Sequence, residues 1–198
     1  TLTGNGRTQV RAASLLNAQG AINALDSLDM QFTGKLDNRQ GRVFSQSSQV
    51  LQAQDIVNTQ GWMGSLGSWR AISGGFDNTQ GSVQSRQETQ LTADWLDNAR
   101  GVMQSAQNLA LRIKQDIDNH SGKVSAQGQL TVQGAADGEH AGTINNTGGE
   151  WLAGQALTIA ARSLDNVQAG QLYSQKQLRL NLNGGLDNRG GEIQSGDA

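Results

Sequence analysis

One pattern, an Asn followed three residues later by a Gly, recurs along this chain and restricts its fold more than any other feature. A full copy reads Leu36-Asp37-Asn38-Arg39-Gln40-Gly41, and the copy at Asn166 carries one extra residue before its Gly. The nine Gly stand at positions 20, 41, 61, 81, 101, 122, 149, 170 and 191, so the copies are 20 or 21 residues apart except for one interval of 27. A period this regular is typical of a stacked repeat, in which each unit contacts only its neighbours.

Within each repeat, two segments alternate between apolar and polar residues with a period of two. Counted from each Gly, the second residue is apolar in every repeat and the fourth is small. The eighth, tenth and twelfth residues are also mostly apolar, with Gln49, Ser73, Thr89 and Gly134 as exceptions. Such alternation predicts strands that turn one face toward a core. A third apolar segment comes directly before each Asn.

Three short strands per repeat predict an all-β fold, a right-handed parallel β-helix of about nine coils of 20–21 residues. Equivalent strands of successive coils would pair in parallel, and the right hand follows the rule for parallel crossovers. A leucine-rich repeat has a similar period but needs a helical return, which the alternation excludes. We interpret residues 1–198 as one β-helix segment excised from a longer chain.

The Asn of each repeat is expected to point inward at a corner of the coil. Stacked amides both donate and accept hydrogen bonds, so the row predicts a ladder along the corner. The Gly that follows could serve either a positive φ or the close approach of the neighbouring coil. The predicted ladder residues are Asn17, Asn38, Asn58, Asn78, Asn98, Asn119, Asn146, Asn166 and Asn188.

The single interval of 27 residues predicts an inserted loop. The extra residues fall near 134–142, where the sequence is small, polar and rich in Gly. His140 lies in this segment beside Asp137 and Glu139, but one His and two carboxylates in a flexible loop do not predict a metal site. We therefore expect a surface bulge without a bound ion.

Charge and composition exclude several classes of partner. The net charge of −2 creates no field that would attract nucleic acid. No apolar run approaches the roughly 18 residues of a membrane-spanning helix, and the absence of Cys removes disulfide and thiolate chemistry. We expect no nucleic-acid partner, no membrane-spanning segment and no cofactor.

The recurring unit Leu-Asp-Asn-x-x-Gly-x-Val-x-Ser, clearest at residues 36–45, 76–85 and 186–195, resembles the repeats of filamentous haemagglutinin and of the CdiA-type contact-dependent inhibition toxins. This resemblance implies a secreted exoprotein on the cell surface of a Gram-negative bacterium. It also implies export through the outer-membrane barrel of a two-partner secretion system. The segment would then be a structural rod that presents an adhesive or toxin tip to a host or bacterial receptor.

The residues also allow two other functions to be considered, binding of a partner and enzymatic cleavage of a polysaccharide. Trp62 and Trp95 fall at positions that are polar in other coils, so we expect them to point outward, where they could bind a surface glycan or protein. Trp69 and Trp151 fall at inward positions and are expected in the core.

The other function is that of a polysaccharide lyase or hydrolase. A catalytic set needs different residues that converge on one point. The corner carboxylates instead form a row of identical residues: Asp37, Asp77, Asp97, Asp118, Asp165 and Asp187. We therefore predict no catalytic residues and no enzyme.

Overall fold

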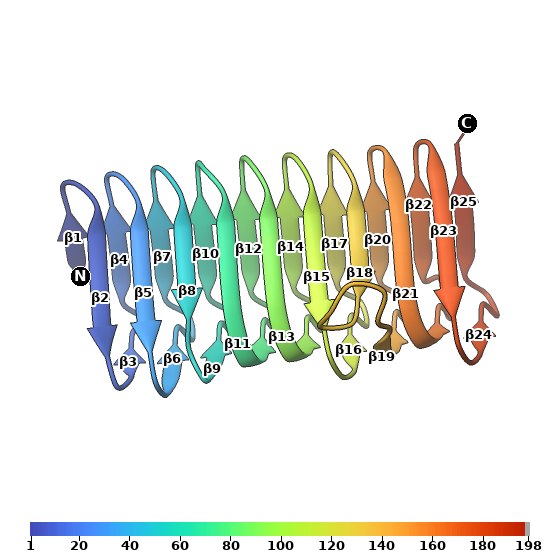
Figure 1. The fold of residues 1–198 in the computed structure, drawn as a ribbon, viewed down its shortest axis with the longest axis horizontal. Coiled ribbons are helices and arrows are strands. Elements are labelled where there is room, and N and C mark those ends of the chain that lie inside the picture. The colour runs from blue at the N-terminus through green and yellow to red at the C-terminus, as the bar shows by residue number, and fades with distance from the viewer. Residues whose placement is uncertain (197–198) are drawn as a thin grey trace.

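The computed structural model describes residues 1–196, and in that part the chain forms 25 short strands without a helix. The last two residues of the predicted repeat segment, Asp197 and Ala198, lie outside the described residues. Figure 1 shows the strands stacked along one axis, with the two termini at opposite ends. The chain runs up the rear sheet and down the front sheet as it advances from the N-terminal end, which is the right-handed sense.

The first strand of each coil belongs to a ten-stranded parallel sheet, here called the rear sheet. Its register is fixed by the repeat: Val43 pairs with Met63, and Met63 pairs with Val83 in the next coil. The strands of the rear sheet are β1 (Leu2–Gly4), β4 (Ala21–Ala24), β7 (Arg42–Ser45), β10 (Trp62–Ser65), β12 (Ser82–Ser85), β14 (Val102–Ser105), β17 (Lys123–Ala126), β20 (Glu150–Ala153), β22 (Gln171–Ser174) and β25 (Glu192–Ser195).

The second and third strands of the coils form one 15-stranded sheet, here called the front sheet. The strands that begin with the second segment of a coil are β2 (Thr8–Ala12), β5 (Leu28–Phe32), β8 (Gln49–Gln52), β11 (Trp69–Asp77), β13 (Thr89–Asp97), β15 (Leu109–Ile113), β18 (Leu130–Gln133), β21 (Ala156–Asp165) and β23 (Gln177–Leu182). The remaining strands of this sheet are β3 (Leu15–Leu16), β6 (Lys35–Asp37), β9 (Asp55–Val57), β16 (Ile117–Asp118), β19 (Ala141–Asn145) and β24 (Leu186–Asp187). In β11, β13 and β21 the second and third predicted segments run on as one strand, although the pairing register skips the junction residues Gly74, Asp94 and Arg162.

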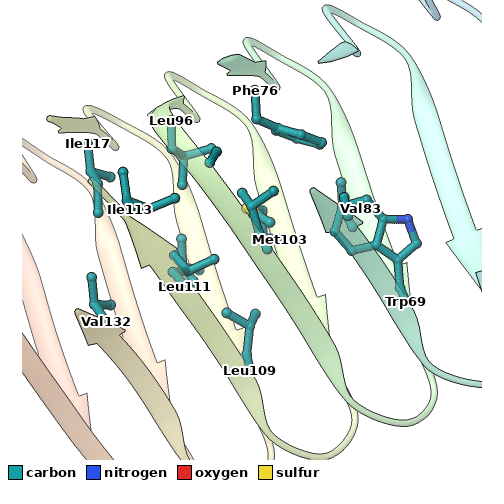
Figure 2. Close-up of a cluster of buried hydrophobic side chains, with 14 of the residues drawn as sticks. Trp69, Phe76, Val83, Leu96, Met103, Leu109, Leu111, Ile113, Ile117 and Val132 are labelled. Carbon is teal, nitrogen blue, oxygen red and sulfur yellow. The ribbon is translucent and has the colours of Figure 1, made fainter. Parts of the chain in front are cut away.

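The inward side chains of both sheets meet in one continuous core along the axis. Trp69 and Trp151 are fully buried, and Trp69 packs edge-on against Phe76 with ring centroids 5.7 Å apart (Figure 2). The polar exceptions at inward positions are buried as well. Thr89 is satisfied by Ser85 Oγ at 2.7 Å, whereas neither amide atom of Gln49 has a hydrogen-bond partner among residues 1–196.

The seventh coil departs from the predicted register. The sequence period assigns Gly134 to the inward position after Val132, and Gly134 is buried, but another residue makes the strand pairing at this position. Ala141 pairs with Ala161 and is 2% exposed, because the chain leaves the coil after β18 and returns at β19. Residues 134–140 lie between these strands and bulge from the front of the molecule (Figure 1). An ion pair of 2.7 Å between Arg112 and Asp137 connects this loop to β15.

Candidate functional site

The corner Asn side chains form a single row of head-to-tail hydrogen bonds. Each Nδ2 donates to Oδ1 of the Asn in the next coil, at 2.7 or 2.8 Å, from Asn17 through Asn188. In the central coils the same Nδ2 also reaches backbone oxygens; for Asn58 these are the oxygens of Gly61 and Ser82, each at 3.2 Å. The seven Asn residues from Asn38 to Asn166 are fully buried, so these bonds lie away from solvent.

Close approach, and not a positive φ, explains the Gly after each Asn. A Cβ built on Gly61 would overlap the backbone oxygen of Asn38 in the preceding coil and would come 2.6 Å from Oδ1 of Asn58. The left-handed backbone belongs to the residue before it, Gln60, whose φ is 55°. The neighbouring corners repeat this arrangement with Gln40 and Gln80, whose φ is 54° in each case.

An Asp precedes six of the nine corner Asn residues and stabilises the same turn in several coils. Oδ1 of Asp77, Asp97 and Asp118 accepts the backbone N–H two residues ahead, at 2.9 to 3.0 Å, which is the geometry of an Asx turn. The Arg39 guanidinium lies 2.6 Å from Asp37, and its hydrogen bonds lower the pKa of that carboxyl below its usual range. The carboxylates of this row therefore stabilise the corner turns. They are spread along the rod and do not converge on a reaction centre.

Among the outer aromatic residues, Trp62 is the more covered. Its ring lies across Gly64 of its own strand and stacks beside Phe44, with centroids 5.9 Å apart and planes 25° apart. The Arg42 guanidinium sits over the indole, 4.4 Å from the ring centroid. Trp62 points outward as predicted. Its indole is nevertheless covered by Arg42 and Phe44 of β7 and lies against Gly64 of β10.

Trp95 presents a different environment on the front sheet. Its indole lies across Gly75 of the preceding coil, and the residue is 39% exposed. Next to it is a surface hollow of about 400 Å³. The polar residues that line this hollow are Asp97, Asp116, Asp118, Thr143 and Asn145.

Sequence reasoning missed the polar part of this hollow. Asp116 is an outward residue of one coil, and Thr143 and Asn145 are outward residues of the next. The period of the core says nothing about their side chains. A signal was present in Gly75, which stands one period before Trp95 and leaves space for the ring.

The two His residues do not join a metal centre. Nδ1 of His120 lies 3.0 Å from Oδ2 of Asp118, as part of the corner, while His140 lies in the loop of the seventh coil. Within residues 1–196, no group of three or more His, Asp or Glu side chains is arranged to hold a metal ion. The described part of the chain also has no helix long and apolar enough to cross a membrane.

Fold and corner together define a class of protein: a parallel β-solenoid whose repeat is built around a buried amide ladder, with the shape of a rod-like segment. Comparison with known families identifies the repeat. The haemagglutinin repeat matches residues 1–121, 108–149 and 152–198, and the chain belongs to this family. It is a family of structural and adhesive repeats of secreted or cell-surface exoproteins, and not an enzyme family. Neither the curated proteins nor the solved structures include a match to this chain.

Proposed function

We propose that this segment is a rigid spacer in an exoprotein of a Gram-negative bacterium, exported through the outer-membrane barrel of a two-partner system. The spacer would hold an adhesive or toxin tip away from the cell that secretes it. The observation that carries this proposal is the unbroken pairing of ten parallel strands in the rear sheet. Each coil adds the same backbone and corner bonds, so the rod can be lengthened by whole coils without a new core.

The shape of the cross-section supports the same role. In residues 1–196 the strands pair with those of neighbouring coils, so the unpaired sheet edges lie at the ends of the rod and not along its side. The inward faces supply continuous packing from coil to coil, which resists bending. A spacer with these properties keeps its ends at a fixed separation.

The spacer function is tested by changing the number of coils. Tandem duplication of residues 42–101 adds three coils that join in register, because Gly101 and Gly41 are equivalent corner residues. The rod should lengthen by about 14 Å, which is three times the inter-strand spacing of roughly 4.8 Å. Small-angle scattering on both proteins measures the maximum dimension.

A matched control duplicates a length that is not a whole coil. Inserting a second copy of residues 42–91 adds two and a half coils and brings a front-sheet segment against a rear-sheet position. This protein should lose cooperative folding. An unchanged maximum dimension after the whole-coil duplication would refute the spacer, as would equal tolerance of both insertions.

A further inference from the structure

Trp95 offers a flat apolar surface that the fold itself does not use. The indole is supported underneath by the backbone of Gly75, a position where any Cβ would collide with the ring. The residue is 39% exposed, in contrast with the core residues Trp69 and Trp151, which are fully buried. A rigid aromatic ring placed this way can stack on the apolar face of a pyranose ring.

The rim of the adjoining hollow supplies hydrogen-bonding groups at the side of this ring. Asp97 uses Oδ1 for the N–H of Ala99 at 2.9 Å, which leaves its second oxygen to accept a hydroxyl hydrogen. The Thr143 hydroxyl accepts from Arg162 at 2.7 Å and from Ser163 at 3.2 Å, so its own proton remains to be donated. An aromatic face beside a few placed acceptors and donors is the usual composition of a small-ligand site.

The charge around the hollow selects between kinds of ligand. Three carboxylates, those of Asp97, Asp116 and Asp118, line it. The nearby cation Arg162 is 3.6 Å from Asp116 and is also bonded to Thr143. The remaining negative charge repels sulfate and uronate groups, whereas hydroxyl groups donate well to carboxylates. The chemistry therefore favours a neutral sugar.

Trp62 does not offer the same opportunity. The Arg42 guanidinium lies over its ring, and Phe44 stacks beside it. A sugar at this position would first have to displace the cation from the indole. Trp62 is thus the natural control for any effect of Trp95.

We propose that the hollow beside Trp95, built from β13, β16 and β19, binds a hexose unit of a neutral glycan. The ring of Trp95 stacks on the sugar, while Asp97 accepts and Thr143 donates hydrogen bonds to its hydroxyl groups. This site lies on the side of the rod, so it does not depend on the spacer role. Loss of glycan binding and loss of the rod are separately measurable.

The test uses the 198-residue chain on an array of neutral β-linked gluco- and galacto-oligosaccharides, with sulfated forms of the same backbones, followed by calorimetry. We expect binding to the neutral series. Trp95→Ala should weaken it at least tenfold, while Trp62→Ala should leave it within twofold. Asp97→Asn keeps the turn, since an Asn side chain also accepts the N–H of Ala99, and should weaken binding severalfold.

Melting temperatures check that each variant folds, and Trp95→Tyr, which keeps an aromatic face, should restore part of the affinity if Trp95→Ala is unstable. Three results would overturn the proposal. They are the absence of binding to any neutral oligosaccharide, an affinity that Trp95→Ala leaves unchanged, and a preference for the sulfated series.

Discussion

Replacing Asn78 with Ala removes one rung from the middle of the corner ladder. Nδ2 of Asn78 donates to Oδ1 of Asn98 at 2.7 Å, and Oδ1 of Asn78 accepts from Asn58 at 2.7 Å. After the change, Asn58 still reaches the backbone oxygens of Gly61 and Ser82 at 3.2 Å. Oδ1 of Asn98 would have no hydrogen bond left, because among residues 1–196 it accepts only from Asn78.

The expected loss follows from that asymmetry. A buried acceptor left without a partner costs about 1–3 kcal/mol, and one acceptor is orphaned here. Asn188 gives a matched control, because its Oδ1 accepts from Asn166 and, within residues 1–196, its Nδ2 donates only to Gly191 O, at 3.3 Å. Asn188→Ala leaves no buried side-chain acceptor without a partner. Its cost in free energy of unfolding from lost ladder bonds should therefore be well under about 1 kcal/mol.

Denaturant unfolding followed by circular dichroism measures both variants against the unsubstituted chain. The m value should be compared first, because repeat proteins can depart from two-state behaviour. A loss for Asn78→Ala that is equal to or smaller than the loss for Asn188→Ala would refute the directional ladder.

Three further changes probe the coil. Gly81→Ala forces a Cβ into the backbone oxygen of the preceding coil's Asn58 and should destabilise the chain by about 3 kcal/mol or more. Gly6 has no atom near the Cβ position, so Gly6→Ala should be tolerated, and thermal melts compare the two variants. Gln49→Leu replaces a buried amide without a partner and should stabilise the fold by about 1–3 kcal/mol, seen as a higher denaturant midpoint. Deleting residues 134–140 should leave the melting temperature nearly unchanged, because it joins β18 directly to β19, while deleting 135–141 removes a buried methyl group and should lower it.

The sequence carries the information about which side chains face inward, and the reason is the fixed period. A residue such as Met63 is inward because its equivalents in the coils before and after are also apolar, and the pairing of Val43, Met63 and Val83 confirms this. The predicted all-β parallel helix follows from the same repetition, and its right hand follows from the rule for parallel crossovers. Because the inward positions recur in nine repeats, the one irregular coil does not change the predicted fold.

Other features depend on single residues and were not predictable in this way. The period alone does not show where an insertion leaves and rejoins the coil, so it does not reveal that Ala141, and not the buried Gly134, pairs with Ala161. The outward direction of Trp62 followed from its position, but its coverage by Arg42 depends on side chains in two coils. The role of each corner Gly required coordinates, since two conformational reasons for a Gly look the same in sequence.

The amide ladder also gives the rod a direction. Because the Nδ2 of each ladder residue from Asn17 to Asn166 points toward the following coil, a coil exposes donors to what comes after it and acceptors to what comes before it. A surface stacked onto the later side must supply an oxygen, and one stacked onto the earlier side must supply an N–H. Two such rods meeting end to end can continue the corner only when both run the same way, since opposed ends would place oxygen against oxygen or N–H against N–H.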